Sequence, residues 1–581
     1  MSLALTGIGV TSGIALGKVH RLTPGELSLP EYYLNADAVE GETERLRRAA
    51  SRGQRFLTSV SERIGESGNE TARELLQAHR LILRDPMLIE ASCERIEQDR
   101  INAEWALAQQ SEQLQDAFRR LDDDYLAQRR EDLEQVVQLI QRELADQPAA
   151  VLGSQIPHRL EDTVLVAVEL SPADLTILSQ RRVAGLITEH GGPWSHVAIL
   201  ARSLEIPMVV GVHHAIELLE EGESVVLDGH YGAVLVNPDD SLERHYAEKQ
   251  AASQRHRVEL RQYLSRPCRT IDKQKFEILG NAELPIEFER CVDAGVSGIG
   301  LMRTEYLFLD EQMPDEQAQF RAYRKAVQIL DGRPVTIRTL DAGGDKLPSA
   351  LALTRGPNPA LGLRGLRLSL SVTDLFCQQL RAILRASTEG PVRILLPMLT
   401  SVDEVAQARQ LIAQCRESLR NEGLNLDPDL PIGGMIETPA AALNAEEMAA
   451  ELDFLSIGTN DLIQYVLAID RQDELVSHLY DPTQPGVIEL LERITAAGRR
   501  HERPVTVCGE LAGDERAARL LLGLGLRQFS MPPARVAAVK KSLIEADSRA
   551  CRDIVTRFRA DAAWRRSHRL LEELAEHGGK S

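Results

Sequence analysis

The chain has 581 residues, of which 43% are hydrophobic and 27% charged, and its 67 Lys and Arg against 87 Asp and Glu leave a formal net charge of −20. This length exceeds what a single hydrophobic core supports, so we expect two or three domains. The acidic balance argues against a nucleic-acid-binding protein, which would carry basic surfaces, and no apolar run reaches the length of a membrane-spanning helix.

The N-terminus and the cysteines indicate the cell compartment. The first residues, MSLALTGIGVTSGIALGK, have no basic residue ahead of their apolar ones and carry Gly and Thr throughout, which is typical of strands and not of a signal peptide. The 7 cysteines are scattered, without the paired spacing of zinc sites. We therefore predict a soluble, cytoplasmic protein with free thiols that neither enters a membrane nor binds nucleic acid.

The first half of the chain changes character twice. Residues 1–33 are glycine-rich and β-like, whereas residues 34–149 show apolar residues at helical spacing, dense charge and almost no glycine. Short β-branched runs return in TVLVAVEL, VAGLITE, PMVVG and SVVLDG. We interpret 1–33 together with 150–240 as one α/β domain, into which a bundle of antiparallel helices at 34–149 is inserted. The long polar helix predicted over 241–265 links this half to the next.

Residues 266–575 alternate short apolar strands with amphipathic helices. The predicted strands are FEILGN, GIGLMRTE, VTIRTLD, VRILLPM, IGGMIET, FLSIGTN, VTVCGE and QFSMP. Eight such units predict a C-terminal (β/α)8 barrel of the TIM type, with an open doubly wound sheet as the alternative. The predicted fold class is therefore an α/β multidomain chain that ends in a barrel.

Charged side chains recur where these strands end, which is where barrels of this kind carry their functional groups. The residues at the strand ends are Arg303, Glu305, Arg338, Met398, Glu437, Asn460, Asp461, Cys508 and Glu510. Any one Arg–Glu pair suits a structural role at the rim, but the recurrence favours a site. Arg303 and Arg338, with Lys346 and Arg471 in nearby loops, form a candidate clamp for a compact polyanion.

Two carboxylates and one thiol suggest further chemistry at the same rim. Glu437 and Asp461 follow neighbouring predicted strands, where they could share a hard divalent cation such as Mg²⁺. Positive charge around a phosphate would stabilise a departing phosphoryl group. Cys508 is either a proton donor or acceptor at the mouth of the barrel or a small buried hydrophobic side chain, and its position alone does not separate the two.

A histidine in the first half stands in an unusual place. The stretch TEHGGPWSHVAILARSLEIPMVVG puts His196 in the first turn of a predicted helix, directly after a glycine turn. The positive field at a helix N-terminus keeps an imidazole neutral and nucleophilic and would stabilise a phosphate attached to it. His196 is therefore a candidate for a transient phosphohistidine, and a histidine that merely packs or caps the helix is the alternative.

These segments together resemble enzyme I of the bacterial phosphoenolpyruvate-dependent phosphotransferase system, and the likeness covers nearly the whole chain. The strongest segments are GGPWSHVAILARSLEIPMVVG, GIGLMRTEYLF, IRTLDAGGDK, LGLRGLR, GGMIETPAA, FLSIGTNDLIQYVLAIDR and VCGELAGDE. The resemblance implies an enzyme that takes a phosphoryl group from phosphoenolpyruvate, releases pyruvate and phosphorylates a histidine of a small HPr-type carrier protein.

Each functional residue of the family has a counterpart in this chain. By resemblance, His196 is the phosphorylated histidine, Glu437 and Asp461 are the magnesium ligands, and Cys508 protonates the enolate carbon. The residues implied to surround the substrate are Arg303, Arg338, Arg364, Asn460 and Arg471, to which the predicted clamp adds Lys346. The resemblance thus favours a functional role for both His196 and Cys508.

The resemblance also implies roles for the domains. The inserted helices at 34–149 would dock the carrier, the α/β domain would swivel His196 between the barrel and the carrier, and the barrels would join a homodimer. The chain departs from the family at two places. Pro193-Trp194 stands where Arg-Thr is usual, and Ile463 replaces a threonine; we expect activity to survive both.

Three other interpretations were weighed. A pyruvate-phosphate dikinase or phosphoenolpyruvate synthase would need an ATP-grasp domain, for which the inserted block is too short and too helical. A regulatory scaffold that binds the carrier without transfer would lack residues that this chain retains. A nitrogen-branch regulatory enzyme typically carries an additional N-terminal GAF domain, whereas this chain starts at LTGIGVTSGIALG, which favours the sugar-type architecture.

Overall fold

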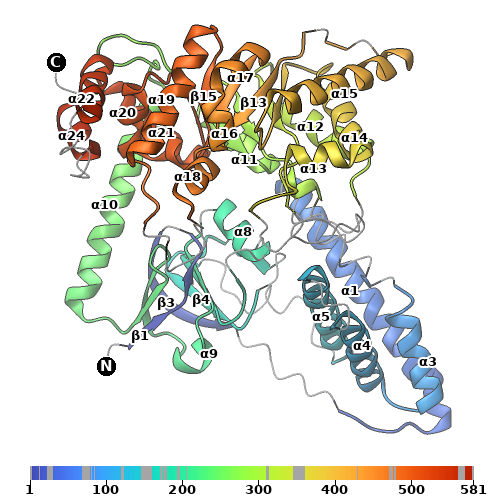
Figure 1. The fold of residues 1–581 in the computed structure, drawn as a ribbon. Coiled ribbons are helices and arrows are strands. Elements are labelled where there is room, and N and C mark those ends of the chain that lie inside the picture. The colour runs from blue at the N-terminus through green and yellow to red at the C-terminus, as the bar shows by residue number, and fades with distance from the viewer. Residues whose placement is uncertain are drawn as a thin grey trace. The chain divides into compact units, whose positions relative to one another are not determined.

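The computed structural model describes residues 3–11, 13–22, 30–67, 79, 82–83, 85–119, 124–145, 160–170, 174–175, 178, 181–192, 196–204, 206–308, 313–343, 360–424, 426–427, 429–469, 476, 479–560 and 570–578. They belong to two compact units, Met1–His256 and Arg257–Ser581, and the boundary lies within the long helix α10 (Asp240–Leu264) (Figure 1). Among the described residues, no helix combines the length and the apolar character needed to cross a membrane.

A mixed eight-stranded sheet organises the first unit, in the order β1-β8-β7-β3-β4-β5-β6-β2. Its strands are β1 (Leu3–Thr6), β2 (Ile8–Gly9), β3 (Ile14–Leu22), β4 (Thr163–Ala167), β5 (Gly185–Thr188), β6 (Met208–Val210), β7 (Ser224–Asp228) and β8 (Ala233–Val236). Strands β4 to β7 fall within the four β-branched runs of the sequence. Strand β3 pairs in parallel with β4, with Lys18 opposite Thr163, although the intervening helices separate the two strands in sequence.

The segment between β3 and β4 is helical, as its composition predicts. After a short 3₁₀ turn, η1 (Ala36–Ala38), it contains α1 (Val39–Ser67), α3 (Ile89–Asp99), α4 (Ala103–Arg119) and α5 (Asp124–Leu144). These helices pack against one another around fully buried residues that include Leu46, Ile96, Leu107 and Ile140 (Figure 1). Within this predicted helical segment, residues 68–78, 80–81, 84, 120–123 and 146–149 lie outside the described residues.

The sheet buries both of its faces because successive side chains point in opposite directions. Val164 and Val166 of β4 join one apolar cluster, which includes Ala215 of the short helix α9 (Ala215–Leu218). Leu165 joins the other cluster, together with Val197 of helix α8 (His196–Ser203). Helix α8 therefore rests its apolar side on the sheet and begins at His196.

A closed barrel of eight parallel strands forms the centre of the second unit, in the order β10-β11-β12-β13-β14-β15-β16-β9. The strands are β9 (Glu277–Ala282), β10 (Ile299–Met302), β11 (Val335–Arg338), β12 (Val392–Leu396), β13 (Ile432–Ile436), β14 (Phe454–Ile457), β15 (Val505–Val507) and β16 (Gln528–Met531). Each lies within, or extends by one residue beyond, a strand predicted from the sequence. The pairing of β16 with β9 closes the ring, so the barrel prediction is confirmed and the open sheet is excluded.

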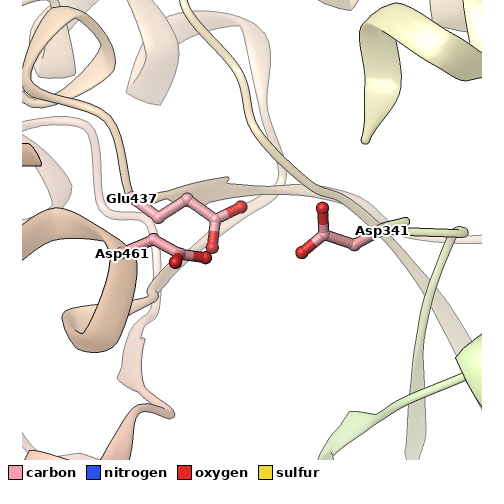
Figure 2. A group of neighbouring side chains, drawn as sticks. All are labelled: Asp341, Glu437 and Asp461. Atoms are coloured by element: carbon pink, nitrogen blue, oxygen red, sulfur yellow. The ribbon is translucent and has the colours of Figure 1, made fainter. Parts of the chain in front are cut away.

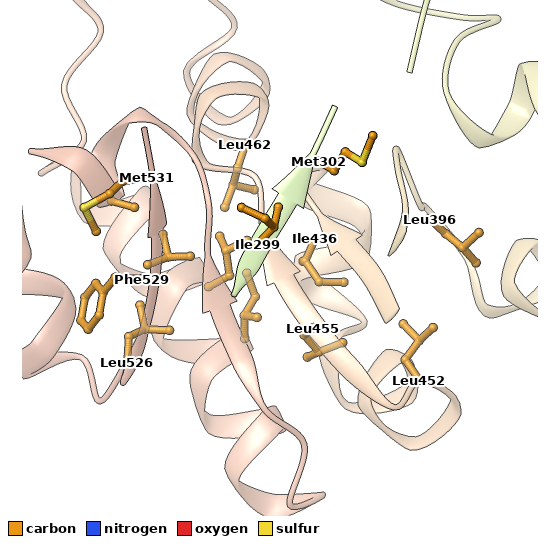
Figure 3. Packing of buried hydrophobic residues seen from close by; sticks show 14 of the residues in the cluster. Ile299, Met302, Leu396, Ile436, Leu452, Leu455, Leu462, Leu526, Phe529 and Met531 are labelled. Atoms are coloured by element: carbon orange, nitrogen blue, oxygen red, sulfur yellow. The ribbon is translucent and has the colours of Figure 1, made fainter. Parts of the chain in front are cut away.

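Helices and short 3₁₀ turns connect the strands and cover the barrel. They are α11 (Pro285–Asp293), η2 (Glu305–Phe308), α12 (Glu316–Leu330), α13 (Leu366–Ser371), α14 (Thr373–Ala386), α15 (Val402–Asn421), α16 (Pro439–Leu443), α17 (Ala445–Glu451), α18 (Thr459–Leu467), α19 (Pro485–Arg500), η5 (Glu510–Gly513), α20 (Glu515–Gly523), η6 (Pro533–Arg535), α21 (Val536–Ile544), α22 (Ser548–Ala560) and α24 (Leu570–His577). Strand residues such as Ile299, Ile436 and Phe529 share one large apolar cluster with helix residues such as Leu462 (Figure 3). Full burial of each such side chain is worth about 1.5–3 kcal/mol, so the core holds the strand ends in place.

Candidate active site

The carboxyl ends of the parallel strands bring the predicted site residues to one rim of the barrel. Arg338 is the last residue of β11, Glu437 directly follows β13, and Cys508 directly follows β15. Asn460 and Asp461 lie in the first turn of α18, which begins at Thr459, directly after β14 and Gly458. Because all eight strands run in the same direction, these ends surround one mouth.

Arg338 is buried between acidic groups at this mouth. Its Nη2 donates to Glu305 Oε1 at 3.0 Å, and its Nη1 lies 3.1 Å from Asp341 Oδ2. Burial by itself would lower the pKa of the guanidinium, but the carboxylates of Glu305 and Asp341 outweigh it and hold that pKa above its ordinary value. Within the described part of the chain, the buried Nε of Arg338 has no hydrogen-bond partner, so one donor is available for a further acceptor.

Arg364 reaches the same place from the loop before α13. Its Nη2 donates to both oxygens of Asp341 at 3.1 Å and to Asp461 Oδ2 at 3.4 Å. Its Nη1 donates to the hydroxyl of Tyr465 at 3.2 Å. The structure thus brings Arg338 and Arg364 together through a shared acid, Asp341. Arg303, which follows β10, is exposed at the rim.

Three carboxyl groups face one another in the mouth, with Glu437 and Asp461 adjacent and Asp341 opposite them (Figure 2). One oxygen of each lies within 4.8 Å of the others. Glu437 is only 1% exposed, and burial, reinforced by the nearby charges of Asp341 and Asp461, raises its pKa well above the ordinary value. Three carboxyl groups this close to one another repel when they are charged, and a hard divalent cation bound to their oxygens would relieve this repulsion.

A backbone hydrogen bond holds the Glu437 carboxylate in place. The N–H of Met398, two residues beyond β12, donates to Glu437 Oε1 at 2.6 Å. Met398 adopts a left-handed conformation with φ of 57°, which few non-glycine residues do. The side chain of Met398, which stands at a predicted strand end, is thus buried, while its backbone contributes to the site.

Cys508, directly after β15, is buried among apolar side chains. It shares a small cluster with Leu301, Leu395, Met435 and Phe454. Burial raises the pKa of its thiol to about 11, against the smaller opposing effect of a hydrogen bond that Ser456 Oγ donates to the sulfur at 3.1 Å. The thiol is therefore protonated at neutral pH and can act as a proton donor.

Two further polar groups are held at the rim. Asn460 and Glu510 exchange hydrogen bonds, since Asn460 Nδ2 donates to Glu510 Oε1 at 3.0 Å and the Glu510 N–H donates to Asn460 Oδ1 at 2.8 Å. Glu283, which directly follows β9, has its pKa raised to about 7 by burial and by the charge of Glu305. The side chain at the end of β9 thus titrates near neutral pH.

Not every predicted residue is described at the mouth of the barrel. Lys346, Arg471, Pro193 and Trp194 lie outside the described residues. His196 is the first residue of α8 and belongs to the first unit. Ile463 is 1% exposed in the barrel core, so the position that departs from the family's threonine contributes packing there.

Sequence reasoning did not single out four residues that the fold brings to the site. They are Asp341, Tyr465, Ser456 and Glu283. Asp341 had a detectable signal, because it follows Arg338 by three residues in IRTLDAGGDK, just past a strand end. Ser456 and Tyr465 had none, since a buried strand serine and a helix tyrosine are common in structural roles.

The chain is similar to known proteins over almost its full length. Three domain families of PEP-utilising enzymes match: the N-terminal domain over residues 6–129, the mobile domain over 160–232 and the PEP-binding domain over 257–548. The phosphoenolpyruvate-protein phosphotransferase of Cupriavidus necator is 40% identical over 556 residues, 94% of this chain and 95% of that protein. The protein of the same name from Bacillus subtilis is 37% identical over 553 residues, 94% of this chain and 95% of that protein.

Proposed function

Because the chain belongs to the phosphoenolpyruvate-protein phosphotransferase family, we propose that it phosphorylates itself on His196 from phosphoenolpyruvate and passes the phosphoryl group to a histidine of an HPr-type carrier. The observation that carries the proposal is the mouth of the barrel. There, the buried Arg338 and the partly buried Arg364, three carboxylates and a neutral thiol converge at the ends of strands from one ring.

The cationic side chains bind the phosphate of the substrate. Arg338 and Arg364 meet at Asp341, and Arg338 Nε has no hydrogen-bond partner among the described residues. Planar guanidinium groups suit phosphate because they offer paired, charge-assisted hydrogen bonds. Arg303, Lys346, Arg471 and the amide of Asn460 complete the proposed substrate-binding set.

Glu437 and Asp461 hold the cation, which we propose to be Mg²⁺. Carboxylate oxygens that leave room for substrate oxygens and water are the environment this ion prefers. A cation bound there would offset the negative charge of the phosphate and of the enolate as they separate. The chain's own contribution is to keep Glu437 in place through the Met398 N–H.

The chemical step balances with the residues present. The bond between phosphorus and the enol oxygen breaks as an imidazole nitrogen of His196 forms a bond to phosphorus. The electron pair left on the enolate takes a proton from the Cys508 thiol at carbon, which gives pyruvate. The thiolate regains its proton from solvent, and the phosphoryl group then moves from His196 to the carrier histidine.

The remaining assignments follow the family. The helices α1, α3, α4 and α5 dock the carrier, the sheet domain carries His196 between the two sites, and the barrels associate as a homodimer. The enzyme works in the cytoplasm, where phosphoenolpyruvate is made. His196 suits its role through its place at the start of α8, where the helix field favours a bound phosphate.

Intact mass of the purified protein after incubation with phosphoenolpyruvate and Mg²⁺ tests the proposal. We expect one acid-labile phosphate on the wild type, with release of pyruvate, and none on His196→Ala. His190→Ala is the matched control, because His190 is an exposed histidine just before the same glycine turn. An unmodified wild type that still binds the carrier would instead identify a regulatory scaffold.

A further inference from the structure

One carboxylate contacts both Arg338 and Arg364 at the mouth. Asp341 Oδ2 lies 3.1 Å from Arg338 Nη1, and Arg364 Nη2 donates to Oδ1 and to Oδ2 of Asp341 at 3.1 Å each. Asp341 is 8% exposed, so these contacts are made away from solvent. The N–H groups that the proposed function assigns to a phosphate are thus directed at an acid of the chain itself.

The same carboxylate faces the candidate cation site. An oxygen of Asp341 lies within 4.8 Å of oxygens of both Glu437 and Asp461 (Figure 2). Asp341 therefore stands between two sets of groups that both attract it, the guanidinium groups on one side and a cation on the other. Both of its oxygens already accept hydrogen bonds from Arg364 Nη2, and Oδ2 also lies 3.1 Å from Arg338 Nη1, so a cation would compete with the guanidinium groups for the same oxygens.

Each arginine keeps another partner when Asp341 is set aside. Arg338 retains Glu305 at 3.0 Å, and Arg364 retains the hydroxyl of Tyr465 at 3.2 Å. The guanidinium groups would consequently stay in position if Asp341 turned away. The Asp341 N–H also donates to Glu305 Oε1 at 3.0 Å, which anchors the backbone while the side chain rotates.

We propose that Asp341 is a positioning residue that competes with phosphate for the N–H groups of Arg338 and Arg364 and turns toward the cation when a phosphate binds. This inference rests on the proposed function. It predicts that cation and phosphate strengthen each other's binding partly through Asp341, because the cation withdraws the acid that competes with the phosphate. Such coupling is reciprocal and is typically worth between about 5-fold and 150-fold in affinity.

The test measures binding of inorganic phosphate to the full-length protein by calorimetry, with and without Mn²⁺, whose binding is followed separately by electron paramagnetic resonance. In the absence of the cation, we expect Asp341→Asn to bind phosphate more tightly than the wild type does. When Mn²⁺ is added, the phosphate affinity of the wild type should rise by a factor that is at least about threefold larger than the factor for Asp341→Asn. Glu305→Gln is the matched control. It removes one negative charge beside Arg338, but Glu305 is not one of the three clustered carboxylates.

The inference would be overturned if Mn²⁺ raised the phosphate affinity of Asp341→Asn as much as that of the wild type. It would also be overturned if Glu305→Gln lost this Mn²⁺ effect to the same extent as Asp341→Asn. Should Asp341→Asn fail to fold, a crystal structure of the wild type with Mn²⁺ and phosphate decides instead. We expect Asp341 to have left both guanidinium groups, and an Asp341 that still pairs with both beside a bound phosphate would refute the exchange.

The two proposals fail separately. If the wild type shows the predicted coupling with inorganic phosphate but releases no pyruvate from phosphoenolpyruvate, the role of Asp341 is supported and the proposed reaction is refuted. If the wild type is phosphorylated on His196 and Asp341→Asn still shows the Mn²⁺ coupling, the proposed reaction is supported and the role of Asp341 is refuted.

Discussion

The backbone N–H of Met398 donates to Glu437 Oε1 at 2.6 Å, from a residue whose φ of 57° lies in the left-handed region. Gly365 packs against this turn with a φ of 57° and a ψ of −133°, and a Cβ added to it would lie 2.7 Å from Met398 Cβ. The position of the most buried carboxylate in the mouth therefore depends on a glycine in another loop.

Gly365→Ala should weaken both the fold and the cation site. The backbone conformation costs an alanine about 1–3 kcal/mol, and the added methyl would push on Met398 and so on Glu437. Thermal denaturation and Mn²⁺ titration measure the two effects. Gly362→Ala is the control, since Gly362 also has a positive φ of 83° but has no atom within 4 Å of an added Cβ. It should lose some stability and keep its Mn²⁺ affinity; a Gly365→Ala protein with wild-type Mn²⁺ affinity would contradict the link.

Binding of a divalent cation should release a proton from Glu437. Its pKa is raised by burial and by Asp341 and Asp461, and a cation binds the carboxylate only after the proton has left. Calorimetry of Mn²⁺ binding in buffers of different ionisation enthalpy counts the protons. We expect Glu437→Gln to release fewer protons than the wild type, together with weaker binding and loss of phosphorylation by phosphoenolpyruvate. Magnesium-dependent phosphorylation that survives in this variant would remove Glu437 from the ligand set.

Cys508→Ala should slow the formation of pyruvate more than the phosphorylation of the protein. Burial holds the pKa of this thiol at about 11, so it carries its proton at neutral pH and can supply it to carbon. Loss of a general acid typically costs roughly 10²-fold or more in rate. Rapid-quench assays of phosphoprotein and pyruvate separate the two steps. Cys551→Ala removes another buried thiol, on α22, and should leave both rates unchanged; equal effects of the two variants would argue against proton donation by Cys508.

The stability of Glu283→Gln relative to the wild type should rise with pH. Burial, followed by the charge of Glu305, raises the pKa of Glu283 from 4.5 to about 7, so the folded state holds a proton that the unfolded state has lost between these values. The raised pKa favours folding below pH 4.5, and that contribution is lost as the pH rises through about 7. The neutral glutamine has no such loss. Denaturation at pH 5 and at pH 8 measures the difference, and a constant gap between the two proteins would contradict the shift.

Much of the barrel could be predicted from the sequence. Each of its strands is a short apolar run between polar turns. The residue at the end of such a run must therefore lie at the end of the corresponding strand. For this reason Arg338, Glu437 and Cys508 could be assigned to strand ends before any coordinates. The order of the strands around the ring brought Glu437 and Asp461 to neighbouring ends, as their motifs indicated.

The sequence by itself determined the class of the fold, the order of its elements and the kind of residue at each strand end, because these depend on local periodicity and on the fixed direction of parallel strands. Only the tertiary structure decided which groups touch. Asp341 meets Arg364, and the Met398 N–H meets Glu437, across loops that are distant in sequence. Burial likewise raised the pKa of Glu437, Cys508 and Glu283, since the pKa of a side chain depends on the water it loses and on the charges that the fold brings beside it.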